Sequence, residues 1–180
     1  MKRKNRLTPA KYAALVGIMA ATIECAKLAL ASLPNVEVVT FLIALFSYTF
    51  GWVGVVATVI FVVIEPIIWG VGSWIITYII YWPLVGVVFM LLGKVGLKNR
   101  WALTGIALGL TFFFGVLSSL VDVGLFSGYF DNFFYRFGIY YSRGIVFYAI
   151  QLACNAVLFL TLFNFTSSKL SIIKTRFLKA

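Results

Sequence analysis

Two pairs of polar side chains lie inside otherwise apolar segments, each at a spacing that puts its members on one helix face. Glu24 and Lys27 are three residues apart, and Gln151 and Asn155 are four apart. The Glu24 and Lys27 pair predicts either a substrate contact near the outer face or an ion pair that only packs the helices. The two amides predict either hydrogen bonds to a ligand or hydrogen bonds between helices.

Aromatic side chains are concentrated in two other regions. Tyr78, Tyr81 and Trp82 lie within one apolar segment, where they could stack a planar ligand or serve as packing and interfacial residues. Residues 122–143 combine a high aromatic content with Asp131 and Arg136. This stretch is too polar to span a membrane and too aromatic for a simple linker. It predicts an ordered outer loop or an interfacial helix that folds over the outer mouth.

The sequence lacks the groups that most catalytic and metal sites need. It has no histidine, so a Ser-His-Asp or Cys-His arrangement is excluded. Cys25 and Cys154 lie in apolar segments without metal-ligand spacing, and no glycine-lysine phosphate loop occurs. We expect a protein that is not an enzyme, holds no metal or cofactor and does not itself hydrolyse nucleotide.

Composition indicates an integral membrane protein. Of its 180 residues 63% are hydrophobic, and the mean hydropathy is +1.05. The apolar runs are continuous rather than alternating, which favours membrane-spanning helices over a β-barrel. The predicted fold is all-α, with residues 1–180 as one membrane domain of six transmembrane helices. The expected spans are residues 10–31, a short second span at 36–50, and then 51–64, 74–92, 101–120 and 144–165.

The charged residues predict how these spans are oriented. The chain has 15 basic residues and five acidic ones. With the N-terminus inside, the basic residues around segment 1–9, in connector 93–100 and in tail 167–180 all fall in the cytoplasm, as the positive-inside rule expects. The acidic residues then fall at or near the outer face. We therefore expect a multi-pass plasma-membrane protein with both termini cytoplasmic, whose basic clusters serve topology and lipid contacts rather than nucleic acid.

Small residues repeat every four positions along the first predicted helix. Ala13, Gly17 and Ala21 form this stripe. Such a surface lets another helix approach closely. The spacing is equally compatible with a partner protein and with packing inside the bundle.

Several short motifs within this topology resemble the substrate-binding S component of energy-coupling factor vitamin transporters. They are residues 33–40 (LPNVEVVT), Gly51 with Gly54, residues 65–74 (EPIIWGVGSW) and residues 81–83 (YWP). The resemblance implies a subunit that binds a vitamin from outside. It also implies docking on a membrane scaffold (T) subunit through Ala13, Gly17 and Ala21, with two cytoplasmic ATPase subunits driving the complex.

The resemblance further implies a substrate site built from the outer loops and helix ends. The outer mouth is aromatic and nearly balanced in charge, which suits a mostly uncharged planar ligand. Cobalamin or a flavin is the first expectation, followed by pyridoxine-type vitamins or queuosine precursors. The alternatives are a self-sufficient small secondary transporter and a structural membrane subunit. The expected substrate-binding residues are Glu24, Lys27, Asn35, Glu37, Thr40, Trp69, Trp74, Tyr78, Tyr129, Asp131, Tyr135, Arg136, Tyr140, Arg143, Gln151 and Asn155.

Overall fold

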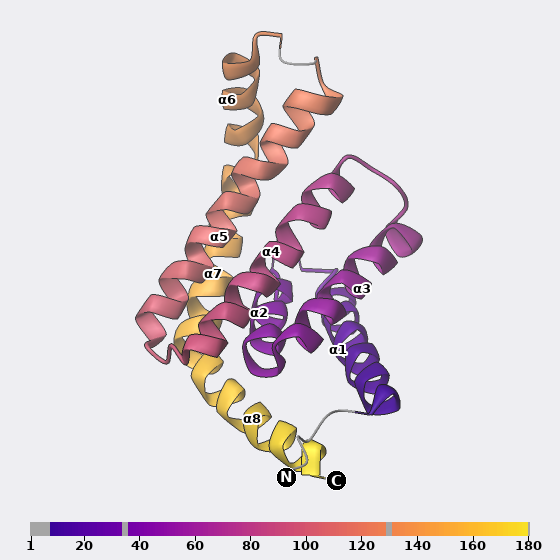
Figure 1. The fold of residues 1–180 in the computed structure, drawn as a ribbon. Helices are drawn as coiled ribbons and strands as arrows, with labels where there is room; N and C mark the ends of the chain where they lie inside the picture. The colour runs from indigo at the N-terminus through magenta and orange to yellow at the C-terminus, as the bar shows by residue number, and fades with distance from the viewer. Residues whose placement is uncertain (1–7, 34–35, 129–130, 180) are drawn as a thin grey trace.

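The computed structural model describes residues 8–33, 36–128 and 131–179, and throughout these ranges the regular structure is helical (Figure 1). Two of the segments, η1 and η2, are single π-helical turns that continue the helix before them. In chain order the elements are α1 (Pro9–Ala29), α2 (Val39–Phe50), α3 (Trp52–Trp69), α4 (Trp74–Val95), α5 (Arg100–Val121), η1 (Asp122–Phe126), α6 (Phe133–Arg143), α7 (Ile145–Leu158), η2 (Phe159–Phe163) and α8 (Asn164–Lys179).

Within the described residues, five helical segments are long and apolar enough to cross a membrane. They comprise α1, α3, α4, the continuous α5–η1 segment and the α7–η2–α8 segment up to Phe177. The chain is therefore all-helical and has the character of a membrane-embedded protein. The expected second span corresponds to α2, which has only 12 residues. At 1.5 Å per residue α2 is about 18 Å long, well short of the ~30 Å hydrocarbon core.

The short helix α2 lies at the centre of the bundle. None of its side chains is exposed, and it packs against α1, α3, α4 and α8. A helix that is apolar on every side is stable only when other elements surround it. The sequence of α2 has this character, with polar groups limited to Thr40, Ser47, Tyr48 and Thr49. Its apolar surface is thus covered by protein.

Two glycines allow the close packing around α2. Gly51 joins α2 to α3 with φ +67°, a backbone conformation that favours glycine. Gly93 of α4 faces the backbone of Tyr48, and a Cβ there would overlap the Tyr48 carbonyl group. Nearby, the Tyr48 hydroxyl donates to the carbonyl of Leu97 at 2.9 Å. These contacts hold the C-terminal ends of α2 and α4 together.

Two parts of the chain, the segment before the last span and the basic tail, are largely helical. Within 122–143, the segment predicted as an ordered outer loop or interfacial helix, residues 122–126 form η1 and residues 133–143 form α6. Beyond residue 165, where the last span was expected to end, the helix continues through α8 to Lys179. The basic tail is therefore a continuation of the final helix across its described residues.

Different helices lie at the two ends of the molecule. The start of α1 meets α8, with the Lys11 ammonium 5.6 Å from the ring of Phe177. Lys174 of α8 donates to the carbonyl of Thr49 at the end of α2, 2.7 Å away. The opposite end carries α6, on an arm of α5, α6 and α7 that extends past the loop between α3 and α4 (Figure 1).

Candidate ligand-binding site

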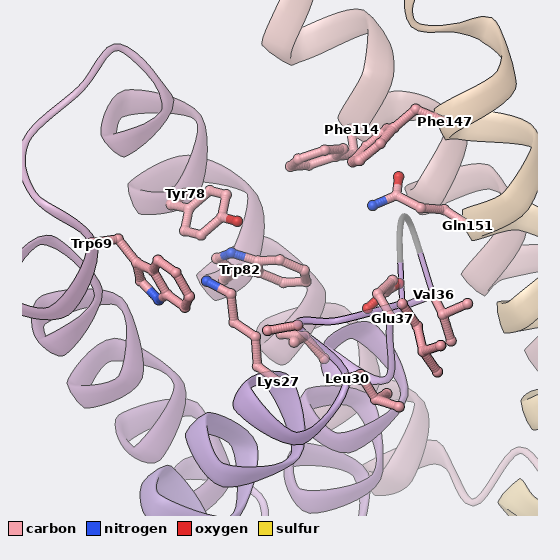
Figure 2. Close-up of a pocket in the computed structure, with 13 residues that line it drawn as sticks. Lys27, Leu30, Val36, Glu37, Trp69, Tyr78, Trp82, Phe114, Phe147 and Gln151 are labelled. Carbon is pink, nitrogen blue, oxygen red and sulfur yellow. The ribbon is translucent and has the colours of Figure 1, made fainter.

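A cavity of about 340 Å³ lies between α1, α3 and α4 on one side and α5 and α7 on the other. We call it the main cavity (Figure 2). The segment joining α1 to α2 forms part of its wall. The aromatic and polar side chains that line it are Lys27, Glu37, Trp69, Tyr78, Trp82, Phe114, Phe147 and Gln151.

Lys27 enters the main cavity from α1 and pairs with Glu65 of α3. Its ammonium donates to Glu65 Oε2 and lies 5.2 Å from the ring of Trp69 and 5.4 Å from that of Tyr78. The expected pairing within α1, between Glu24 and Lys27, is therefore replaced by a contact between helices. A side chain on α3 can reach Lys27 because α1 and α3 pack against one another.

Two carboxyl groups are buried behind this ammonium. Glu65 is 1% exposed and Glu24 is 7% exposed. The carboxyl groups of Glu24 and Glu65 interact through a hydrogen bond as well as through charge repulsion, and Lys27 attracts Glu24 as well as Glu65. Burial of an acidic group without such a partner would be costly.

Glu37 links three helices at the floor of the main cavity. Its Oε1 accepts a hydrogen bond from Asn155 Nδ2 at 2.8 Å, and its Oε2 accepts one from the Thr40 backbone N–H at 3.0 Å. The second bond satisfies a free N–H at the start of α2, where the helix dipole also favours a negative charge. Asn155 Nδ2 donates further to Thr111 Oγ1 of α5 at 3.0 Å. The structure thus brings together Glu37, Thr40 and Asn155, three of the expected site residues.

Aromatic rings form much of the cavity wall. Trp74, Tyr78 and Trp82 form a ladder along α4, with ring centroids separated by 4.9 Å and then 5.5 Å. Phe114 of α5 contacts this ladder, with its ring centroid 6.1 Å from that of Trp82, and Phe147 of α7 lies beside Phe114 (Figure 2). Sequence reasoning missed both phenylalanines. Each is one of 18 phenylalanines in an apolar chain, so neither carries a distinguishing signal.

A second cavity of about 480 Å³ adjoins the first, and we call it the arm cavity. It shares Tyr78, Phe114 and Phe147 with the main cavity, and it reaches Trp74. Its remaining lining includes Ser118, Tyr140, Arg143, Gly144 and Tyr148. The two cavities therefore form one region that runs from Lys27 to the base of α6. A smaller cavity of about 150 Å³ beside α6 is lined by Arg136 together with Tyr140 and Arg143.

Other expected site residues lie elsewhere. Asp131 and Tyr135 are exposed and line none of the cavities described here. Tyr135 is 74% exposed, so its ring faces away from the protein interior. Asn35 and Tyr129 lie outside the described residues.

The small-residue stripe of α1 faces outward. Ala13, Gly17 and Ala21 are all exposed. A Cβ added at Gly17 would have no neighbouring atom within 4 Å. The buried face of α1 is instead formed by larger residues such as Met19 and Ile23. Of the two interpretations of the stripe, packing within this bundle is therefore excluded.

Comparisons of the chain with family models, with curated proteins and with solved structures find no match. Within the described part of the chain, no group of three or more His, Cys, Asp or Glu side chains is placed to hold a metal ion. The arrangement brings stacking surfaces, an ion pair and hydrogen-bonding groups together around one cavity.

Proposed function

We propose that this chain is the substrate-binding S subunit of an energy-coupling factor importer for a vitamin or related micronutrient. The observation that carries the proposal is the main cavity with its aromatic walls and its ionic floor. Ligand sites are typically concave, largely apolar and provided with a few convergent polar groups. The main cavity has each of these properties, and it lies in a chain with membrane-spanning character.

The exposed stripe of α1 supports the coupling part of the proposal. In a lone bundle, small residues on a helix surface contribute little packing to the protein itself. A close helix–helix contact in a membrane requires such residues because there is little hydrophobic gain from bringing two apolar helices together in lipid. Ala13, Gly17 and Ala21 form the docking surface for the scaffold subunit, which in turn binds two cytoplasmic ATPases.

The orientation belongs to the same proposal. The chain crosses the plasma membrane six times, with α2 as a short central crossing and both termini in the cytoplasm. Support comes from the basic side chains near the meeting of α1 and α8, since positive charge is retained on the cytoplasmic side. The main cavity then opens toward the outer leaflet, beneath the arm that carries α6.

The volume of the main cavity limits the size of the substrate. Its volume of about 340 Å³ is near the lower end for ligand sites. This favours a single flavin-sized or smaller ring system over the far larger corrinoid of cobalamin. The aromatic walls favour a planar ligand, because rings stack on flat surfaces.

A packed layer beneath the cavity argues against the alternative of a self-sufficient transporter. Phe41, Phe89, Phe159 and Phe163 are buried and contact one another through α2, α4 and η2, with Phe159 and Phe163 stacked at 4.9 Å. A channel or secondary transporter needs a polar path past this level. A structural subunit, the other alternative, would need no ligand cavity.

The test is purification of the chain from membranes that also contain its genomic partners, followed by mass spectrometry of the associated proteins. Wild type should retain a membrane scaffold subunit and an ATPase pair. Gly17→Leu should lose them, because the side chain fills the docking surface. Gly105→Leu is the matched control, since Gly105 of α5 is also exposed and a Cβ added there would have no atom within 4 Å. Uptake of the ligand by cells that lack all such ATPases would contradict the proposal.

A further inference from the structure

We infer that the main cavity selects a planar aromatic ligand bearing a positive charge or an amine, and that it rejects anions. The inference rests on the proposed function in one respect only, namely that the main cavity is the substrate site. It narrows the expected substrate class by the charge of the ligand, which neither the volume of the cavity nor its aromatic walls determine.

The first argument is the balance of ionisable groups. The carboxyl group of Glu37 lines the main cavity and that of Glu65 lines an adjoining side cavity, whereas Lys27 is the one basic side chain that lines the main cavity among the described residues. The Lys27 ammonium is already bound to Glu65. Its charge is thus largely compensated before any ligand enters. The excess negative charge attracts a cation and opposes an anion in a poorly solvated site.

The second argument is the setting of the Lys27 ammonium itself. It lies 5.9, 5.2 and 5.4 Å from the ring centroids of Phe61, Trp69 and Tyr78. Aromatic faces attract cations, most strongly where water is excluded. This part of the protein therefore already accommodates one positive group. The Tyr78 ring continues into the wall formed by Trp82 and Phe114, which extends the same type of surface toward the ligand.

The third argument is an acceptor that remains available. Glu65 Oε1 is buried and accepts no hydrogen bond from an N–H donor, with the Glu24 carboxyl group as its neighbour, while the other oxygen of the same carboxylate binds Lys27. Glu65 lines a side cavity of about 200 Å³ together with Lys27, Trp69, Trp74 and Tyr78, three of which also line the main cavity. An unpaired buried acceptor is unfavourable, and a donor on the ligand would relieve this cost.

Together these observations favour an aromatic amine or a cationic heteroaromatic ring over a neutral flavin. The ring would stack on the wall formed by Tyr78, Trp82 and Phe114. Its charged or amine-bearing edge would lie toward Glu65 and Glu37. A carboxylate or phosphate on the same ring would meet those carboxylates instead.

The experiment uses three probes that share one ring and differ in charge. Tryptamine is a cation, tryptophol is neutral and indole-3-acetate is an anion near neutral pH. Their affinities for the purified full chain in detergent are measured by isothermal titration calorimetry. We expect tryptamine to bind at least about tenfold more tightly than indole-3-acetate, with tryptophol between them. Equal or tighter binding of indole-3-acetate overturns the inference, as does the absence of binding by all three probes.

Variants assign the preference to named side chains. Glu65→Gln and Glu37→Gln should each reduce the ratio of tryptamine to indole-3-acetate affinity by several-fold. Asp122→Asn is the matched control, because it removes an acidic charge from a residue that lines none of the cavities described here. If Glu65→Gln does not fold because Lys27 loses its partner, Glu37→Gln carries the assignment, since Glu37 lines the main cavity and is not paired with Lys27. An equal reduction in Asp122→Asn overturns the assignment.

The two proposals fail separately. Loss of the scaffold and ATPase association, with the charge preference intact, contradicts the transporter proposal and leaves the ligand class standing. A normal association with ATPases, combined with a preference for the anionic probe, contradicts only the ligand class.

Discussion

Lys27 and Glu65 join α1 to α3 through an ion pair that is mostly shielded from water. Glu65 is almost fully buried, whereas Lys27 keeps 24% of its side chain exposed. Removing charges from water is costly, so such pairs add little to stability over an apolar contact of the same size. Their effect on geometry is larger, because removal of one partner leaves the other unpaired. This pair therefore positions the ammonium beside the aromatic rings.

Glu37 and Asn155 have a comparable role on the other side of the cavity. The Glu37 carboxylate binds the start of α2 and the Asn155 amide of α7 at once. Hydrogen bonds to a charged group are stronger than those between neutral groups. The contact therefore fixes α7 relative to α2 at the level of the cavity floor.

Tyr140 provides a test of the contacts at the base of α6. Its hydroxyl donates to Asp122 Oδ2 at 2.8 Å. Burial first, and then this hydrogen bond and the negative charge of Asp122, raise the pKa of Tyr140 from 10.0 to about 12. The folded state thus prefers the protonated phenol. The contribution of this contact to stability is complete below about pH 10 and is lost as the pH rises through about 12.

An alkaline titration of tyrosinate absorbance measures this directly. Tyr140→Phe should lack one of the ionisation steps of the wild-type protein, which assigns that step to Tyr140. In the wild type this step should lie near pH 12. In Asp122→Asn the same step should move to lower pH, since the charge that opposes ionisation is gone, but it should stay above the ordinary tyrosine value because burial still raises the pKa of Tyr140. A Tyr140 step that does not respond to Asp122→Asn would mean that the two side chains do not interact.

At the scale of the elements, α2 and α4 pack closely against each other. The helices approach closely at Gly93, which faces the Tyr48 backbone, and again at Gly86, where a Cβ would lie 3.3 Å from Ser47 Oγ. Such contacts leave no room for a larger side chain. A well-packed interior responds to an added methyl group by moving backbone, which is unfavourable.

Gly93→Ala should therefore destabilise the protein by about 1–3 kcal/mol, because its methyl group overlaps backbone atoms that cannot rotate away. The measurement is the thermal unfolding midpoint of the purified protein in detergent. Gly105→Ala is the matched control: it makes the same chemical change in α5 at an open, exposed position and should be neutral or slightly stabilising. Equal midpoints for the two variants would show that α2 and α4 are not in close contact at Gly93.

At the scale of the whole molecule, the chain has two chemically different ends. The basic side chains of α1 and α8 meet at one end, and α6 with its aromatic residues lies at the other (Figure 1). Because a membrane protein retains positive charge in the cytoplasm, the first end should be inside. The cavity region runs toward the second end, reaching Tyr140 and Arg143 of α6.

Accessibility of introduced cysteines tests this orientation in intact cells. The background carries Cys25→Ser and Cys154→Ser, so that the native thiols do not react. Lys98→Cys should react only with a membrane-permeable reagent, whereas Phe134→Cys on the exposed face of α6 should also react with an impermeable one. Phe134 is 88% exposed, so the reagent has access to it. The opposite pattern of labelling would reverse the orientation.

The sequence by itself determined the membrane character, most of the helical segments and the separation of basic from acidic residues. These are local properties, because hydropathy and charge are read along the chain without reference to any contact. The sequence also indicated Lys27, Glu37, Tyr78 and Gln151, since polar or large aromatic groups are conspicuous in apolar segments. All four line the main cavity.

Only the tertiary structure decided which of these groups meet. Lys27 pairs with Glu65, 38 positions away in the sequence, rather than with the nearby Glu24. Phe114 and Phe147 become cavity walls, and α2 becomes a buried central helix instead of an ordinary span. The reason is physical. A helix presents several faces, and the face that meets a neighbour depends on the rotation and offset of both helices, which only the packing of the whole bundle determines.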